Sequence, residues 1–424
     1  MDINKLLAGV KCSCGKVHLC DIKTVCVEDG AIGRLGEFFK DYSRILLVAD
    51  GNTYLAAGEA CCSVLGESVF HKIIFDGSRV LIPNEDSIER VEAELGDADL
   101  ILGVGSGVIQ DLCKYVSKDK GVPYAVVATA PSMDGYASNG AAMITGGMKV
   151  TYPAGLPIAI IADTSVIANA PMEMIKAGFG DIIGKYSALC DWKLSALVNG
   201  EYFCDYIYDT TNDMIVETLG AVKGILARDK NSLRILTEAL IVVGIMMSFA
   251  GSSRPASGSE HHLSHFFEIV GIVKNEDYFP HGIDVIYSTY VTAKLREKLL
   301  NTKFKKTSTR QSEDELKSEL ERVYASCAEG CMALQEKVGS YKRELADIYV
   351  KNERKIKKVL GEMPPAAMIR EILQLGEIDI APLFEMYGRE KICDAVRYAK
   401  DLKDRYTVLW LAYDMDVTLS PEEL

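Results

Sequence analysis

The sequence predicts an α/β fold, in which a domain built on a parallel β-sheet precedes an all-helical domain. The chain has 424 residues, more than one average core holds, so we expect two domains. Short β-branched runs alternate with helical stretches over residues 44–163, which is typical of a parallel sheet with crossover helices. Long amphipathic stretches predominate after Asp163. We therefore expect an α/β domain at residues 1–165 and a helical domain at residues 166–424.

The expected strands are the apolar runs at residues 45–49, 72–75, 100–104, 124–128 and 158–162. The expected helices of the second half cover residues 171–197, 233–249, 313–338 and 343–360. The apolar segment 239–247 is much shorter than the roughly 20 residues that span a bilayer, so we interpret it as part of a buried core helix. Residues 303–310, rich in lysine and hydroxyl side chains, predict an exposed loop.

Composition restricts the partners and the compartment. A formal net charge of -13 argues against nucleic-acid and anionic-membrane binding, because both partners need a basic face. Any anionic substrate must then meet a local positive site. The N-terminal residues 1–9 lack the basic and apolar parts of a signal peptide, so we expect a cytoplasmic protein.

Cysteine usage fits that compartment. Twelve cysteines in so long a chain do not form a disulfide framework, and we expect reduced thiols. Cys12 and Cys14, followed closely by His18 and Cys20, are the cysteine cluster that could bind zinc. Their spacing fits no common zinc knuckle, so a small hairpin turning at residues 15–16 is the favoured interpretation.

A glycine-rich loop ends the expected strand at residues 100–104. Gly103, Gly105 and Gly107 stand at alternate positions before a helical stretch. Small residues let a backbone approach a pyrophosphate, and the amides at the start of the helix favour negative charge. An ordinary tight turn has the same pattern. The position at the end of a mid-sheet strand favours the dinucleotide loop.

Two further segments follow strands at the same sheet edge. Residues 129–138 contain hydroxyl groups and the carboxylate of Asp134, which suit phosphate, ribose or polyol contacts, although an ordinary polar loop has the same composition. Asp50 ends the first strong strand, where a carboxylate can bind the hydroxyls of adenosine ribose. A helix cap is the alternative for Asp50.

Four of the six histidines lie within residues 261–281. If residues 260–268 are helical, His261 and His265 lie one turn apart on one face, where two imidazoles can serve one site. Asp181, in an apolar and glycine-rich helical stretch, needs a partner. With His261 and His281 it would offer a divalent metal one oxygen and two nitrogens and leave open positions, as in catalytic sites. Surface or capping histidines are the alternative.

These motifs together resemble the sn-glycerol-1-phosphate dehydrogenases, particularly their bacterial branch. The wider superfamily contains glycerol dehydrogenase, iron-type alcohol dehydrogenases and dehydroquinate synthase. The resemblance covers residues 20–300 in order, and the motifs that carry it lie at residues 103–114, 130–138, 177–181, 253–261 and 280–282. It implies a Rossmann-like α/β domain that binds a dinucleotide, followed by a helical domain that binds metal and substrate, the architecture of dehydroquinate synthase.

The resemblance also assigns residues. It implies Asp181, His261 and His281 as metal ligands, and Asp134, Asp181 and His265 as substrate contacts. The implied cofactor contacts are Asp50, Gly105, Ser106, Gly107, Val108, Ile109, Gln110, Asp111, Thr129, Ala130, Pro131, Ser132 and Ser138. Archaeal members usually have an arginine where this chain has Val108, which leaves NAD(H) and NADP(H) both open.

The implied reaction is the reversible reduction of dihydroxyacetone phosphate to sn-glycerol 1-phosphate. The metal would polarise the ketone while the nicotinamide delivers hydride, with Asp181 and His265 as catalytic residues. His265 would hold a substrate hydroxyl or pass a proton, and support of a metal ligand is the alternative. Lys185 and Arg254 are the cationic candidates for the substrate phosphate, with a solvated surface role as the alternative for each.

Several properties stay open at this stage. Zn2+, Ni2+ and Fe2+ all suit one carboxylate with two imidazoles. A cytoplasmic homo-oligomer, a homodimer serving phospholipid biosynthesis, is the expectation. The rival functions are a glycerol dehydrogenase that uses an unphosphorylated polyol, a lyase like dehydroquinate synthase, and a catalytically silent nucleotide sensor.

Overall fold

A computed structural model describes residues 2–79, 81–146, 148–306 and 310–424. The chain forms two compact units: Met1–Ile182 with Asp209–Ser253, and Ile183–Tyr208 with Arg254–Leu424. This division differs from the expected boundary at residue 165. The reason is α10 (Lys230–Ala250), which packs on α7 (Thr164–Ala168) and on the short helix η4 (Gly135–Ala137) of the sheet-containing unit.

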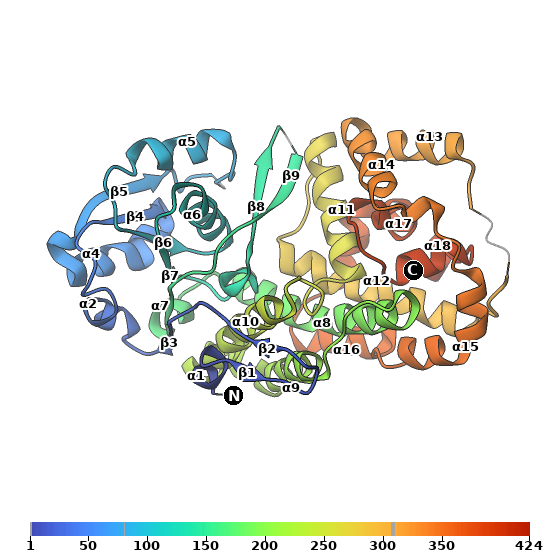
Figure 1. The fold of residues 1–424 in the computed structure, drawn as a ribbon, viewed down its shortest axis with the longest axis horizontal. Coiled ribbons are helices and arrows are strands. Elements are labelled where there is room, and N and C mark those ends of the chain that lie inside the picture. The colour runs from blue at the N-terminus through green and yellow to red at the C-terminus, as the bar shows by residue number, and fades with distance from the viewer. Residues whose placement is uncertain (1, 80, 147, 307–309) are drawn as a thin grey trace. The chain divides into compact units, whose positions relative to one another are not determined.

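The first unit is built on a six-stranded sheet, and its strands are β3 Thr24–Glu28, β4 Ile45–Asp50, β5 Val69–Phe75, β6 Leu100–Gly105, β7 Tyr124–Ala128 and β10 Ala159–Asp163. Their order is β3-β10-β7-β6-β4-β5, and every neighbouring pair is parallel (Figure 1). The predicted parallel sheet is therefore confirmed. The central strands are buried on both faces, so each one is a continuous apolar run.

The strand order reverses between β4 and β6. From β4 the chain proceeds to β5 on one side and then returns to β6 on the other side. Ligands of open α/β sheets bind outside the carboxyl ends of the strands at such a switch point. Asp50 and Gly105 are the last residues of β4 and β6, so both predicted motifs lie at this edge.

Two antiparallel strand pairs of the first unit lie outside the six-stranded sheet. The hairpin of β1 Val10–Lys11 and β2 Val17–His18 confirms the small hairpin predicted to turn at residues 15–16. The hairpin of β8 Gly140–Thr145 and β9 Met148–Pro153 was not predicted. The helices of this unit are α1 Ile3–Leu7, α2 Leu35–Phe38, α3 Gly51–Thr53, α4 Glu59–Leu65, α5 Glu85–Glu94, α6 Gly107–Lys120, α7 and α10. The helices α8 Met172–Asn199 and α9 Asp205–Leu226 each contribute residues to both units.

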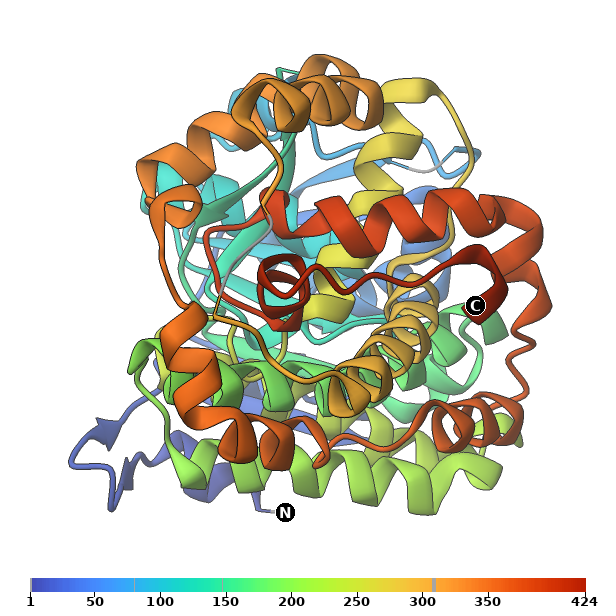
Figure 2. The same ribbon diagram turned by 90° about the vertical axis from the view of Figure 1, so that its right-hand side faces the viewer.

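The second unit is helical, as predicted. Its helices, which run from yellow to dark red in Figure 2, are α11 Ser259–Lys274, α12 His281–Asn301, α13 Glu313–Tyr324, α14 Ala328–Lys337, α15 Ala346–Leu360, α16 Ala366–Leu375, α17 Ala381–Tyr398 and α18 Val408–Asp414. The single helix expected at residues 313–338 is broken, because Ala325 adopts a left-handed φ of 47° between α13 and α14.

Two smaller predictions concern apolar and charged segments. Among the described residues, α10 is the helix long and apolar enough to suit a membrane span, and 72% of its apolar window is buried inside the protein. The predicted core helix is confirmed. In the expected loop 303–310, residues 307–309 lie outside the described residues, Phe304 is buried, and Arg310 forms an ion pair with Asp414.

Candidate active site

The glycines at the end of β6 and the start of α6 have two different roles. A Cβ on Gly105 would lie 2.8 Å from Cβ of Ile109, and a Cβ on Gly103 would lie 3.0 Å from Sγ of Cys113. Real Cβ contacts are longer, so these two glycines let α6 pack closely on β6. Gly107 begins α6, and its N-cap residue Ser106 makes no side-chain capping hydrogen bond. The amides of the first turn therefore keep the capacity to bind an anion.

Gln110 stabilises the backbone of the glycine loop. Its side chain is fully buried, and Nε2 donates hydrogen bonds to the carbonyl oxygens of Gly103 (3.1 Å) and Gly105 (3.2 Å). The predicted cofactor residue thus fixes the backbone of the glycine loop, which is a positioning role.

Lys114 organises the neighbouring loop, and sequence reasoning gave it no role. Its buried ammonium group donates to the carbonyl oxygens of Gly135 and Gly140, each at 2.9 Å, to Oγ of Ser138 at 3.2 Å and to Oδ1 of Asp111 at 3.3 Å. Asp111 and Ser138, both predicted cofactor contacts, therefore contact a buried cation. A lysine on the inward face of an amphipathic helix is the sequence signal that could have indicated this.

Residues 129–138 are held between two helices of the first unit. A Cβ on Gly178 of α8 would collide with the carbonyl oxygen of Pro131, and a Cβ on Gly244 of α10 would lie 2.9 Å from the carbonyl oxygen of Asp134. The amide of Asp134 donates to Oδ2 of Asp181 at 2.9 Å. The structure thus brings the predicted residues Pro131, Asp134 and Asp181 into one neighbourhood.

Asp50 caps a helix. Its Oδ1 accepts hydrogen bonds from the amides of Asn52 (2.8 Å) and Thr53 (2.9 Å), and Oγ1 of Thr53 accepts a hydrogen bond from the amide of Asp50 (3.0 Å). The capping alternative is confirmed. Contact between Asp50 and adenosine ribose stays a prediction.

Three histidines converge in the second unit. His261 and His265 lie one turn apart on α11, and His281 is the first residue of α12. The ring centroids of His261 and His281 are 5.0 Å apart, those of His265 and His281 5.7 Å, and those of His261 and His265 6.2 Å. The surface alternative fails for His261, which is 5% exposed. The second unit therefore presents imidazole nitrogens suited to a divalent cation.

Glu260 orients the first of these rings. Its Oε1 accepts hydrogen bonds from Nδ1 of His261 and from the amide of Gly258, both at 2.7 Å. With Nδ1 carrying the proton, Nε2 is the nitrogen that can ligate a metal. Burial, aided by the charge of Asp191, raises the pKa of Glu260 to about 7. Sequence reasoning missed Glu260, although an acidic residue directly before a buried ligand histidine is a usable signal.

His261 is kept neutral. Burial and the positive charge of Lys185 lower the pKa of His261 well below its ordinary value. A neutral imidazole is the form that binds a metal. Lys185 is itself fully buried, so the surface alternative does not apply to it.

Arg254 has structural partners in the second unit. Its guanidinium donates to both carboxylate oxygens of Glu201, at 2.7 and 2.5 Å, and to the carbonyl oxygen of Tyr406 at 2.7 Å. It also donates to Oγ of Ser195 at 3.3 Å. These contacts occupy most of its donors and favour a structural role over the predicted contact with a substrate phosphate.

Comparisons with known proteins identify the family of this chain. The family of iron-containing alcohol dehydrogenases matches residues 26–171. A protein of Halalkalibacterium halodurans named glycerol-1-phosphate dehydrogenase (NAD(P)+) is 35% identical over 324 residues, which cover 73% of this chain and 80% of that protein. A protein of the same name from Geobacillus thermodenitrificans is 36% identical over 275 residues, 63% of this chain and 68% of that protein.

Solved structures share the fold. The alcohol dehydrogenase from Oenococcus oeni aligns with a TM-score of 0.59 over 95% of this chain and 96% of its own, at 13% sequence identity. This likeness concerns the fold alone, because the identity is so low.

Proposed function

We propose a reaction and a set of site residues from the premise that this chain belongs to the family of NAD(P)-dependent glycerol-1-phosphate dehydrogenases. It is an oxidoreductase that acts on a CH–OH group. The proposed reaction is the reversible reduction of dihydroxyacetone phosphate by NADH or NADPH to sn-glycerol 1-phosphate. The observation that carries the proposal is the convergence of His261 and His281, with Glu260 fixing the tautomer of His261.

Asp181, His261 and His281 would hold the divalent metal. Asp181 is assigned from helix geometry. On α8, Gly184 lies one turn after Asp181, and a Cβ on Gly184 would lie 3.5 Å from Cγ of Glu260. Glu260 precedes His261 directly, so a carboxylate one turn earlier on α8 is suited to reach the same cation.

The fit of the donor set supports a metal. One carboxylate and two neutral imidazoles are a catalytic set for Zn2+, Ni2+ or Fe2+, with positions left for substrate. The bound cation would supply charge stabilisation at the ketone oxygen, and the bound nicotinamide would supply the hydride. The chain's own residues orient these groups and supply the proton.

His265 is the proposed proton donor. It follows His261 by one turn, and its ring lies 5.7 Å from that of His281. The oxygen that gains negative charge during hydride transfer needs a proton, and an imidazole titrates in the right range. Support of a ligand is the alternative. A His265→Gln variant separates them, because a lost proton donor lowers kcat with metal content unchanged.

Lys185 is the proposed partner of the substrate phosphate, since it is buried and its charge acts on His261. The cofactor pyrophosphate would bind the first amides of α6, with residues 129–132 and Asp134 lining the nicotinamide and substrate side. Both NAD(H) and NADP(H) stay open as cofactors. The cytoplasmic location, the homodimer and the role in phospholipid biosynthesis stay predictions.

A two-ketone assay tests the function. The protein is purified without nickel affinity, its metal content is measured, and NADH oxidation is followed with dihydroxyacetone phosphate and with dihydroxyacetone. We expect turnover with the phosphorylated ketone and little with the other. Equal or faster turnover of dihydroxyacetone would indicate a glycerol dehydrogenase. Absence of turnover with Zn2+, Ni2+ and Fe2+ alike would indicate a silent sensor.

A further inference from the structure

The N-terminal hairpin places three metal-binding side chains in a small turn. β1 and β2 pair antiparallel, with Val10 opposite His18. The turn closes through the amide of Cys12, which donates to the carbonyl oxygen of Lys16 at 3.0 Å, and through Gly15, whose φ of 87° favours glycine. Cys12 and Cys14 lie inside this turn and His18 on the returning strand.

The ligand atoms are close together. Sγ of Cys14 lies 3.5 Å from Nε2 of His18, and the ligand atoms of Cys12, Cys14 and His18 all lie within 4.8 Å of one another. Typical bond lengths to Zn2+ in a tetrahedron predict a sulfur–nitrogen separation of about 3.5 Å. The separation between Cys14 and His18 therefore equals that of two ligands of one zinc ion.

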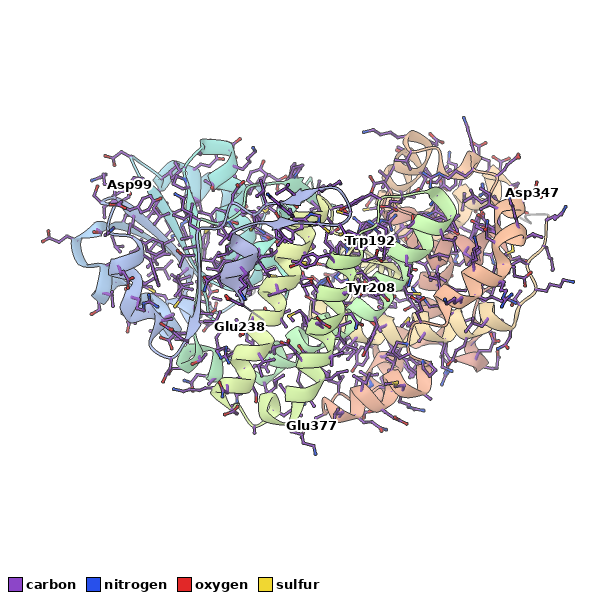
Figure 3. All side chains as sticks on the ribbon, turned by 60° about the horizontal axis from the view of Figure 1, so that its bottom comes forward. Asp99, Trp192, Tyr208, Glu238, Asp347 and Glu377 are labelled. Carbon is purple, nitrogen blue, oxygen red and sulfur yellow. The ribbon has the colours of Figure 1, made fainter. Side chains whose placement is uncertain are left out.

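The hairpin is short and partly exposed. Its strands have two residues each, and isolated short hairpins are marginal in water. Val17 is 58% exposed and the neighbouring Leu19 is 65% exposed, so the hairpin buries little apolar surface through them. His18 is buried and stacks on Phe249 of α10 with a centroid distance of 5.2 Å. That contact fixes the imidazole against α10, the helix on which Glu238 is labelled in Figure 3.

We propose that Cys12, Cys14 and His18 bind a structural Zn2+ ion. Thiolates and imidazole are the ligands of structural zinc sites, and binding releases the thiol protons. The amide of Cys14 lies 3.5 Å from Sγ of Cys12 and can donate to it, which favours the thiolate. The site has ligands unlike those of the catalytic set, because Asp181, His261 and His281 contain no sulfur, and it does not depend on the proposed function.

A structural zinc ion usually has four ligands, and the hairpin supplies three of them.

The test measures sulfur-bound zinc in the full-length chain. Protein without an affinity tag is purified in the presence of Zn2+, zinc is counted by elemental analysis, and its ligands are identified by X-ray absorption. Sulfur neighbours at about 2.3 Å report this site only, since the catalytic set holds none. We expect Cys14→Ser and His18→Ala each to lose one zinc ion per chain.

Cys20→Ser is the matched control, because Cys20 lies in the same segment but outside the ligand group. It should keep the sulfur-bound zinc of the wild type. Wild-type protein with no sulfur-bound zinc, or a Cys14→Ser variant that keeps it unchanged, would overturn the proposal. Should that variant fail to fold, zinc release from wild-type protein by a thiol-modifying reagent decides: one ion per chain supports the site and none overturns it.

Discussion

Replacing Glu260 by glutamine should weaken metal binding at His261. The carboxylate of Glu260 is fully buried, and its Oε1 accepts a hydrogen bond from Nδ1 of His261 at 2.7 Å. This hydrogen bond is therefore charge-assisted and shielded from water. Glutamine has nearly the same shape as glutamate but no charge. Its hydrogen bond to Nδ1 therefore makes Nε2 of His261 a weaker base. Loss of such a partner typically costs 10–100-fold in metal affinity, or about 1.4–2.8 kcal/mol.

The assay is the free metal concentration that gives half-maximal NADH oxidation, with buffered Zn2+ or Ni2+. We expect this concentration to rise 10–100-fold in Glu260→Gln, while kcat at saturating metal changes little. Asp414→Asn is the control, since Asp414 is another buried carboxylate of the second unit that contacts Tyr349 at 2.7 Å and no histidine. An unchanged metal requirement in Glu260→Gln, or an equal rise in Asp414→Asn, would refute the reasoning.

Four further substitutions test other parts of the structure. Lys185→Met should raise KM for dihydroxyacetone phosphate at least tenfold and leave KM for dihydroxyacetone nearly unchanged; similar changes for both ketones would contradict a phosphate contact. Arg254→Leu should instead lower the free energy of unfolding by about 1–3 kcal/mol, with equal kinetic effects on both ketones; a selective rise in KM for the phosphorylated ketone would restore the original prediction. Gly105→Ala should cost about 1–3 kcal/mol and raise KM for NADH, because the added methyl group collides with α6, whereas Gly33→Ala meets no atom within 4 Å and should be near neutral. Burial raises the pKa of Asp284 well above its ordinary value, so the stability that its protonated form contributes is lost as pH rises through that pKa. As pH rises from mildly acidic to mildly alkaline, the free energy of unfolding should therefore fall less in Asp284→Asn than in the wild type. Urea unfolding with a chelator present measures this difference.

The sheet was predictable because its central strands are buried on both faces and therefore form uninterrupted apolar runs. β3 was missed because it is a short edge strand with only Cys26 fully buried, so its pattern is weak. The break at Ala325 was missed because helix periodicity continues across it. The unit boundary also differs from the expected one, since contacts of α10 with the first unit depend on tertiary packing that no local pattern encodes.

The sequence predicted those parts of the site that depend on the spacing of residues along the chain. A one-turn interval pairs His261 with His265, and the turn into α12 returns His281 to them. Glu260 was missed although its partner His261 is the next residue. Lys114 was missed because three of its four partners lie 21, 24 and 26 residues away in the sequence. Arg254 illustrates the same limit, because its partner Glu201 lies 53 residues away.

The four hydrogen bonds of Lys114 have an evolutionary consequence. One ammonium group satisfies two carbonyl oxygens, a hydroxyl and a carboxylate around residues 135–140. Acetylation or a neutral replacement would remove all four donated hydrogen bonds at once and leave the carbonyl oxygens of Gly135 and Gly140 with the hydroxyl of Ser138 as their side-chain donor. A substitution of Lys114 should therefore require simultaneous substitutions in residues 135–140. Descendants of this chain are expected to inherit the lysine and that segment together.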